Sequence, residues 1–548
     1  MTNQQNLRRW VEGAIVYQIY PRSFYDFNND GIGDIKGIEA KLDYLKELGV
    51  NAIWLSPFYP SPMADFGYDV ADYCDVDPIF GNIEDIKELI GNAHKRDIRI
   101  MVDLVPNHTS DEHEWFRQSR QSKDGEYADW YIWKDPAGLD KNGNPLLPNN
   151  WIDVLTGETA WEWEPSRQQF YLHSFDVKQP DLNWTNPEVR EAIKEVMRFW
   201  LDLGVDGFRV DAVQFMAKDP LFRDEPKNPN YNPKNDSKYG LLLHPNNHGW
   251  PQIYAYLSEM AAVLKEPKYL ISPRFMVLES YPDTHEPVEE YLGYYESIDP
   301  LVAAPFNFEG LDLGLPWRAD SWRDFLTKFH KSLDDHSNLC VASYAFGNHD
   351  RSRIVSRVGE EVARSMAVLL LTLPGMVFIY NGEEIGMKDG DIPKNMIQDP
   401  CARGGSGRDP QRTPMQWSAG TNAGFSRAKS TWLPVAKGYE TSNVDYQLKQ
   451  DDSFLSLYKK LGSLRNQNPA IKYGSFSIID TGNKHVVGFI RQYKEDKIKV
   501  LINFSGESQK VAAKVADGER VLSSVGYGQQ NGKDSQLLAP NEALVIKL

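Results

Sequence analysis

Cysteine is scarce in this sequence of 548 residues, which contains only Cys74, Cys340 and Cys401 and no CxxC pair. Three widely separated cysteines supply neither a disulfide framework nor a thiolate metal site, so we expect reduced thiols in a reducing compartment. The residues at the N-terminus are polar and lack the apolar core of a secretory signal peptide. Together these features predict a cytoplasmic protein.

Long apolar runs and an excess of positive charge are missing as well. The run at 366–380 is shorter than a membrane span and contains Pro374-Gly375, so we expect a buried helix followed by a buried strand. The 77 acidic and 60 basic residues give a formal charge of −17. That charge argues against nucleic acid or an anionic membrane as a partner, because both require a basic surface.

Buried strands alternate with amphipathic helices along much of the chain, and 41% hydrophobic residues are enough for a large core. Strands are predicted at 14–20, 51–56, 99–105, 206–211, 275–278, 339–344 and 376–380, and helices at 34–48, 83–93 and 187–203. Right-handed crossovers turn such units into a parallel sheet. About eight units predict an α/β fold of the closed (β/α)8, or TIM barrel, type rather than an open doubly wound sheet.

Two parts of the chain break this alternation. Residues 108–174 are rich in Trp, Asp, Asn, Gly and Pro, and they predict a subdomain inserted after the third strand. Residues 472–548 contain short alternating strands, which predict a C-terminal antiparallel β-sandwich. The catalytic barrel then comprises 1–107 and 175–471. A further insertion at 224–247, rich in Pro, Asn and Lys, is expected to form a loop over the entrance and to shape which leaving groups fit.

The strand at 206–211 presents an arginine and a carboxylate. Arg209 and Asp211 are two residues apart, so their side chains lie on the same face of the strand. At a barrel mouth, Arg209 would keep Asp211 ionised and make it a nucleophile. The same residues also suit an ion pair that only stabilises the core.

Other chemically active side chains fall at the ends of predicted strands. His108 follows the third strand, Glu279 ends the fifth, and His349 and Asp350 follow the seventh. Each of them has an ordinary structural interpretation when taken alone. Three carboxylates and two histidines at the C-terminal ends of barrel strands, however, predict an active site.

Several stretches resemble the α-amylase family of glycoside hydrolases, in its α-glucosidase and oligo-1,6-glucosidase branch. They are 103–108 (DLVPNH), 207–212 (GFRVDA), 277–279 (VLE) and 346–350 (FGNHD), together with 179–184 (QPDLNW) and 412–417 (RTPMQW). The resemblance implies that Asp211 is the nucleophile, Glu279 the general acid/base, and Asp350 a third carboxylate that binds sugar hydroxyls.

The resemblance also implies how these groups divide the work. A retaining glycosidase needs one ionised carboxylate and one protonated carboxylic acid, roughly 5 Å apart. We expect Arg209 to keep Asp211 charged, and the charges of Asp211 and Asp350 to raise the pKa of Glu279. His108 and His349 would donate hydrogen bonds to the sugar that is cleaved.

Residues 64–69 (ADFGYD) are similar to a loop of the same branch, in which Tyr68 would stack under the sugar ring. The resemblance pairs Asp65 with Arg408 at the floor of the pocket, which would admit only a non-reducing end and make the action exo. The alternative is a surface salt bridge that contributes little to the stability of the fold. In this branch a valine after the nucleophile accompanies α-1,6 preference, so Ala212 favours α-1,4 substrates such as maltose.

The loop 26–34 carries oxygen ligands at alternate positions, with glycines that permit a tight turn. It suits a hard cation such as Ca²⁺, with Mg²⁺ as the alternative ion, and the resembled branch has a structural metal here. The expected ligands are Asp26, Asn28, Asp30, the carbonyl of Ile32, and Asp34. A simple polar turn without a metal is the alternative interpretation. No organic cofactor is expected.

Other functions remain open at this point. A glucosyl transferase, a trehalose-forming isomerase or an α-1,6-preferring oligosaccharide glucosidase would share the same carboxylates. A glycosidase-like heavy chain of an amino-acid transporter is a remote alternative, since it has a transmembrane helix and lacks catalytic carboxylates. The substrates are expected to be small α-glucosides, and the oligomeric state, monomer or dimer, stays open.

Overall fold

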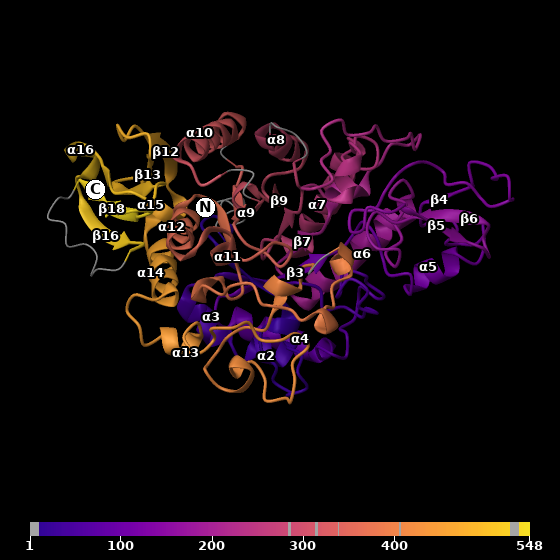
Figure 1. Cartoon of the computed structure of the whole chain (residues 1–548), viewed down its shortest axis with the longest axis horizontal. Coiled ribbons are helices and arrows are strands. Elements are labelled where there is room, and N and C mark those ends of the chain that lie inside the picture. Colours follow the sequence, from indigo (N-terminus) through magenta and orange to yellow (C-terminus); the bar gives the residue numbers. More distant parts are fainter. Residues whose placement is uncertain (1–9, 283–286, 313–315, 338, 405–406, 526–535) are drawn as a thin grey trace.

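The computed structural model describes residues 10–282, 287–312, 316–337, 339–404, 407–525 and 536–548. Figure 1 shows an elongated molecule in which a C-terminal sheet, a central barrel and an inserted subdomain lie in a row. Among the described residues, no helix is long and apolar enough to cross a membrane.

Eight parallel strands form the barrel, in the order β10-β11-β1-β2-β3-β7-β8-β9. Their bounds are β1 (Ile15–Ile19), β2 (Ala52–Leu55), β3 (Arg99–Leu104), β7 (Gly207–Val210), β8 (Phe275–Leu278), β9 (Ala303–Pro305), β10 (Ser343–Ala345) and β11 (Met376–Tyr380). A parallel bridge between Asn307 and Tyr344 joins the two ends of this order, and the N–H of Asn307 donates to the carbonyl of Ser343 at 2.8 Å. The predicted (β/α)8 barrel is confirmed.

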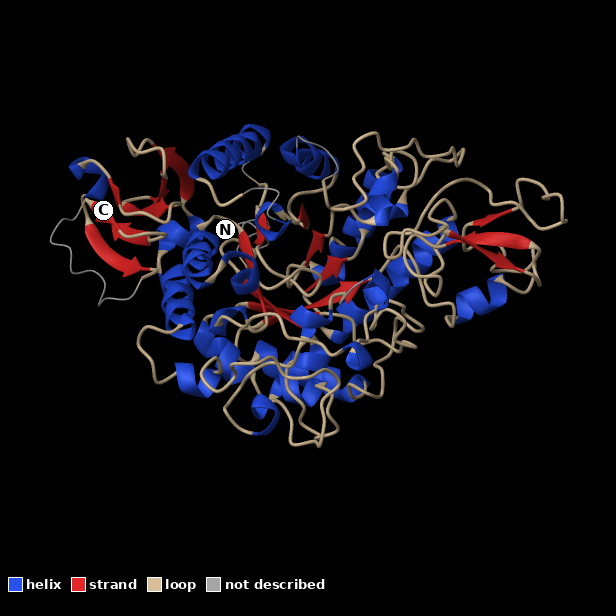
Figure 2. Cartoon of the chain, in the orientation of Figure 1, coloured by secondary structure: helices blue, strands red, loops and turns tan. Residues whose placement is uncertain are grey.

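Helices surround these strands (Figure 2). The principal ones are α4 (Ile83–His94), α6 (Pro187–Leu203), α7 (Gln252–Leu264), α8 (Pro287–Ser297), α10 (Ala319–His336), α12 (Glu360–Thr372) and α14 (Phe454–Gln467). The single helix expected at 34–48 is instead two helices, α2 (Ile35–Glu39) and α3 (Leu42–Leu48). At the break Lys41 leaves helical geometry, and its ammonium lies 4.1 and 4.2 Å from the ring centres of Tyr25 and Trp417.

The inserted subdomain follows β3 and has a small core of its own. It contains α5 (Glu114–Ser119) and an antiparallel sheet of β4 (Trp133–Lys134), β6 (Gln169–Leu172) and β5 (Trp161–Glu164). Trp151, Trp161 and Phe170 are buried together in that core, and Phe222 from the barrel side packs against them.

The C-terminal part contains the expected antiparallel sheet. Its five strands are β12 (Ser475–Ile479), β13 (Val486–Tyr493), β14 (Asp496–Asn503), β18 (Ala543–Lys547) and β16 (Glu519–Ser523). A separate pair, β15 (Gln509–Lys510) and β17 (Leu537–Leu538), forms a two-stranded sheet. The boundaries given above for the three domains stay a prediction.

Candidate active site

A cavity of about 530 Å³ lies at the C-terminal ends of the barrel strands. Most of the side chains predicted from the sequence line it: Asp65, Tyr68, His108, Asp211, Glu279, Asp350 and Arg408. The two other predicted site residues, Arg209 and His349, are almost fully buried next to that lining. The structure therefore gathers the predicted set into one place.

Arg209 connects the carboxylates of three adjacent strands. Its Nη1 lies 2.8 Å from Asp103 Oδ1 and 2.6 Å from Asp211 Oδ1, while its Nη2 lies 2.6 Å from Glu279 Oε1. Strand register explains the meeting, because Asp103 and Val277 are the cross-strand partners of Arg209 on β3 and β8. Asp211 and Glu279 each follow two residues later on the same face.

The electrostatics of this cluster correct one expectation. Burial raises the pKa of Asp211 well above its usual value, although Arg209 acts in the opposite direction. Burial likewise raises the pKa of Asp103 to about 6. The guanidinium serves three acids at once, so its charge is not reserved for Asp211. The raised pKa expected for Glu279 stays a prediction.

The chain turns sharply directly after Asp211. Ala212 adopts the left-handed conformation, with φ 45° and ψ 39°, which is uncommon for a residue with a Cβ atom. The N–H of Ala212 donates to Glu279 Oε2 at 2.9 Å. Glu279 is thus held through one oxygen by Arg209 and through the other by the backbone, which fixes its carboxyl group beside Asp211.

Asp350 has a different environment from Asp211. Its Oδ1 lies 2.9 Å from Arg412 Nη2 and 3.3 Å from Arg408 Nη1. Burial opposes ionisation, but the charges of Arg408 and Arg412 hold the pKa of Asp350 well below its usual range. Asp350 is therefore an anion that can accept hydrogen bonds from hydroxyl groups.

His349 lies against Tyr68 in this structure, and its expected contact with a sugar stays a prediction. Its ring is stacked on that of Tyr68, with centroids 5.3 Å apart, and its Nε2 lies 2.7 Å from the Tyr68 hydroxyl. The side chain has no exposed area, and burial lowers the pKa of His349 well below the usual value, so the ring is neutral. His349 orients Tyr68. The Tyr68 side chain faces the cavity, and its hydroxyl group donates to Asp103 Oδ2 at 3.0 Å. His108, by contrast, lines the cavity as expected.

The predicted pair of Asp65 and Arg408 is present, and both side chains line the cavity. Arg408 Nη2 contacts Asp65 Oδ1, and the same guanidinium contacts Asp399 at 2.7 Å through Nη2 and at 3.0 Å through Nε. Gln179 Nε2 donates to the other oxygen of Asp65 at 3.1 Å.

Sequence reasoning missed the role of three residues in this network: Asp399, Gln179 and Arg412. Gln179 and Arg412 belong to stretches that were noted only as family signatures. Asp399 lies in an irregular segment, where the only available signal was an acidic residue nine positions before Arg408.

The predicted metal loop satisfies its carboxylates internally. Asp26 accepts the N–H groups of Asn29 and Gly31 at 2.6 and 2.8 Å, and Asp34 accepts those of Phe27 and Gly37 at 2.9 and 2.6 Å. In the part of the chain that the structure describes, no group of three His, Cys, Asp or Glu side chains is placed to hold a metal ion. In this arrangement the carboxylates are turned toward backbone amides, and the metal with its ligand set stays a prediction.

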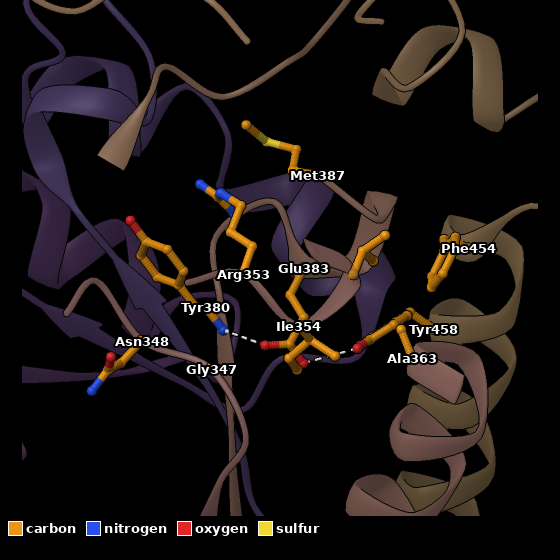
Figure 3. A pocket seen from close by; sticks show the side chains of 11 residues that line it. Gly347, Asn348, Arg353, Ile354, Ala363, Tyr380, Glu383, Met387, Phe454 and Tyr458 are labelled. Atoms are coloured by element: carbon orange, nitrogen blue, oxygen red, sulfur yellow. Dashed lines mark hydrogen bonds between the residues drawn. The ribbon is translucent and has the colours of Figure 1, made fainter. Parts of the chain in front are cut away.

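A smaller cavity, with room for about one water at 10 Å³, lies behind the loop that carries Asp350 (Figure 3). Glu383 extends between Gly347 and Tyr458 there and accepts a hydrogen bond from the Tyr458 hydroxyl at 2.9 Å. Burial raises the pKa of Glu383 to about 7. This cavity is too small for a sugar, and its side chains support the loop of Asp350 from behind.

Comparisons with known proteins agree with this geometry. A family model described as the catalytic domain of alpha amylase matches residues 18–474. The chain is 39% identical to an alpha-glucosidase from Apis mellifera, covering 98% of this chain and 92% of that protein. It is 40% identical to an oligo-1,6-glucosidase from Parageobacillus thermoglucosidasius over 91% of each. A solved structure of an alpha-glucosyl transfer enzyme matches with a TM-score of 0.87 and 34% identity, covering 98% of this chain and 99% of that one.

Replacing Asp399 with asparagine is expected to destabilise the fold around Arg408. Although burial opposes ionisation, hydrogen bonding to Arg408 lowers the pKa of Asp399 to about 2. This depressed pKa contributes about 2 kcal/mol of stability above the unfolded pKa of about 4, which is lost as the pH falls toward 2. Thermal unfolding should show a lower Tm for Asp399→Asn at pH 7 and convergence with wild type at acidic pH.

The matched control is Asp391→Asn, which removes an exposed carboxylate that pairs with Lys437. Its Tm should stay close to that of wild type, because exposed ion pairs contribute little. Equal Tm values for Asp399→Asn and wild type at pH 7 would contradict the assigned role.

Proposed function

Because this chain belongs to the α-amylase family of glycoside hydrolases, we propose that it is a retaining exo-α-glucosidase that releases α-glucose from short α-glucosides. The observation that carries the proposal is the shared guanidinium: Asp211 and Glu279 both contact Arg209, which places the two carboxyl groups side by side. A close pair of carboxyl groups is the requirement of a retaining mechanism, in which they stand roughly 5 Å apart.

In the proposed mechanism, Asp211 attacks the anomeric carbon while Glu279 donates a proton to the departing oxygen. The glucosyl group is then linked to Asp211, and Glu279 takes a proton from the water that releases α-glucose. The mechanism requires that Glu279 is protonated and Asp211 is ionised at the moment of attack. The ionised carboxylate of Asp350 would accept hydrogen bonds from sugar hydroxyls and stabilise positive charge in the transition state.

The paired Asp65 and Arg408 in the cavity lining support exo action. Asp65 and Arg408 pair beneath the position of a terminal glucose, and Asp399 holds Arg408 in place. A chain that continued past this point would meet buried ionic groups, so a non-reducing end is the part that enters. Ala212 lines the cavity beside the nucleophile and supports the α-1,4 preference, an effect that one small side chain can produce at about 1–3 kcal/mol.

Glucosyl transfer is the second candidate function, and the match to an alpha-glucosyl transfer enzyme over nearly the whole chain favours it. Transfer and hydrolysis share the first step and differ in whether water or another hydroxyl group completes the second. A trehalose-forming isomerase and an α-1,6-preferring glucosidase would use the same cluster. For a transporter heavy chain, by contrast, we find no supporting feature in the described residues, where Asp211, Glu279 and Asp350 are all present. The cytoplasmic location stays a prediction.

The proposal is tested by measuring glucose release from maltose, isomaltose, trehalose and sucrose, with the product anomer followed by NMR. We expect α-glucose as the first product and maltose as the preferred substrate. Asp211→Ala should lower kcat by about 10⁴-fold, because the nucleophile is lost. Asp335→Ala, which removes an exposed carboxylate on α10, should retain full activity. Release of β-glucose, or an active Asp211→Ala enzyme, would overturn the mechanism, and trehalose formed from maltose would favour the isomerase.

We also propose that loop 26–34 binds Ca²⁺ as a structural ion after its carboxylates turn away from the loop amides. At a hundredfold excess over Kd, Ca²⁺ should raise the Tm by about 5 °C relative to protein in chelator. Asp30→Ala should remove this shift, whereas Asp72→Ala, outside the loop, should keep it. An identical Tm with Ca²⁺ and with chelator would contradict the metal site.

A further inference from the structure

A network of hydrogen bonds leads from the catalytic cavity into the barrel and ends at a residue of β1 that the proposed mechanism does not use. Gln18 Nε2 lies 2.8 Å from His349 Nδ1, and His349 Nε2 lies 2.7 Å from the Tyr68 hydroxyl. The Tyr68 hydroxyl lies 3.0 Å from Asp103 Oδ2. These four residues are at most 5% exposed, so water does not compete for their contacts. We call them the buried network.

The direction of the hydrogen bonds is set at the Asp103 end. Asp103 Oδ1 accepts from Arg209 at 2.8 Å, and Oδ2 accepts from the indole N–H of Trp54 at 3.1 Å. Burial raises the pKa of Asp103 to about 6, so the group is mainly an anion above pH 7 and has no hydrogen to donate. Burial also raises the pKa of Tyr68 well above its usual value, so its hydroxyl keeps a hydrogen. Tyr68 therefore donates to Asp103.

That direction decides which nitrogen of His349 carries the ring hydrogen. The Tyr68 oxygen can only accept from His349, so Nε2 must carry a hydrogen and donate it. Burial lowers the pKa of His349 well below its usual value, so the ring is neutral and has a single N–H. Nδ1 is then a bare acceptor that faces the amide of Gln18. A bare Nε2 would instead place its lone pair 3.4 Å from Asp350 Oδ2.

Both hydrogens of the Gln18 amide nitrogen are used in this arrangement. One goes to His349 Nδ1, and the other goes to the hydroxyl oxygen of Ser56, 3.1 Å from Nε2. Among the described residues, the amide oxygen of Gln18 has no hydrogen-bond partner. A buried oxygen without a partner lowers the stability of the fold, so its presence needs an explanation. The requirement for a donor at His349 Nδ1 supplies one.

Ring packing around His349 does not select this state by itself. The ring is stacked on those of Tyr20 and Tyr68, with centroids 5.6 and 5.3 Å apart and interplanar angles of 22° and 5°. Stacking sets the plane of the ring but permits a half-turn within that plane, which would put carbon where each nitrogen stands. Stacking is also indifferent to which nitrogen carries the hydrogen. The contact with Gln18 opposes both changes, because it requires a bare Nδ1.

We propose that Gln18 is a positioning residue, which fixes the orientation and the Nε2–H tautomer of His349 and thereby holds Tyr68 in the catalytic cavity. Gln18 does not reach the substrate and acts through His349. Without its N–H, the ring can turn or carry its hydrogen on Nδ1, and Tyr68 then loses the donor that orients its hydroxyl. Because Tyr68 lines the cavity, this freedom reduces the population of productive complexes. The effect on catalysis rests on the proposed glycosidase function, whereas the tautomer does not.

The tautomer is tested by NMR of protein with ¹⁵N-labelled histidine, without substrate, slightly above pH 7. Signals that disappear in His349→Gln identify His349, and couplings from the ring C–H groups to the two nitrogens show which nitrogen carries the hydrogen. We expect Nε2–H in the wild type. In Gln18→Met, which keeps the length of the side chain and removes both N–H groups, we expect a population with Nδ1–H.

The wild-type spectrum tests the direction of the buried network whether or not Gln18→Met folds. Hydrogen on Nδ1 in the wild type would overturn the inference. A spectrum of folded Gln18→Met that is identical to that of the wild type would overturn it as well.

Kinetics test whether this positioning affects catalysis. In Gln18→Met, kcat/KM for maltose should fall about tenfold, the scale of one hydrogen bond. The matched control is Ser56→Ala, which removes the other acceptor of the same amide and keeps the contact between Gln18 and His349. Both variants lose a buried hydrogen bond and should lose Tm, but Ser56→Ala should keep the kcat/KM and the tautomer of the wild type. An equal fall of kcat/KM in both variants would overturn the positioning role.

Failure of the proposed function would give a different pattern. If the wild type releases no glucose from any α-glucoside while the tautomer changes in Gln18→Met, the glycosidase proposal fails and the control of His349 by Gln18 stands. If Gln18→Met releases glucose from maltose as fast as the wild type, the glycosidase proposal stands and the positioning role fails.

Discussion

The active cluster depends on one buried cation. Arg209 contacts Asp103, Asp211 and Glu279, which come from three adjacent barrel strands. Removing one member of such a buried ionic group leaves an uncompensated charge and costs about 3–5 kcal/mol. Parallel register places the arginine between β3 and β8, so the contacts that hold this end of the barrel together also set the two proposed catalytic carboxyl groups side by side. Stability and catalysis therefore share the same interactions.

The surroundings of each carboxylate divide the work among them. Asp350 meets both Arg408 and Arg412 and stays ionised, whereas Asp211 shares a single guanidinium with two other acids and has a raised pKa. A cluster of three acids and one cation keeps a proton readily, which suits a reaction that needs one acid and one base. Glu279 is held at both oxygens, through one by the N–H of Ala212 and through the other by Arg209.

Sequence patterns predict the barrel and much of the site because both rest on local features. The bounds of α6 follow from Pro187 at its start and Gly204 in a left-handed C-cap at its end. Residues at the C-terminal ends of the strands meet at one mouth of the barrel, whatever conformation the loops adopt. β9 has only three residues, which are too few for an alternating pattern to be visible in the sequence. The contact between Asp399 and Arg408 depends on the conformation of a loop, which a sequence pattern does not reveal. Depth of burial is also invisible in a motif, so the sequence alone does not show that His349 stacks on Tyr68.

Water and an acceptor alcohol compete for the same covalent intermediate, and the lining beyond the cleaved bond decides the outcome. The barrel strands and the Arg209 cluster need not change for this choice to shift, because part of the cavity lining comes from the inserted subdomain and from the insertion after β7. A chain can therefore be similar to both a glucosidase and a glucosyl transfer enzyme over nearly its whole length. In this fold the chemistry belongs to the strand ends, and the choice of acceptor belongs to the insertions that cover them.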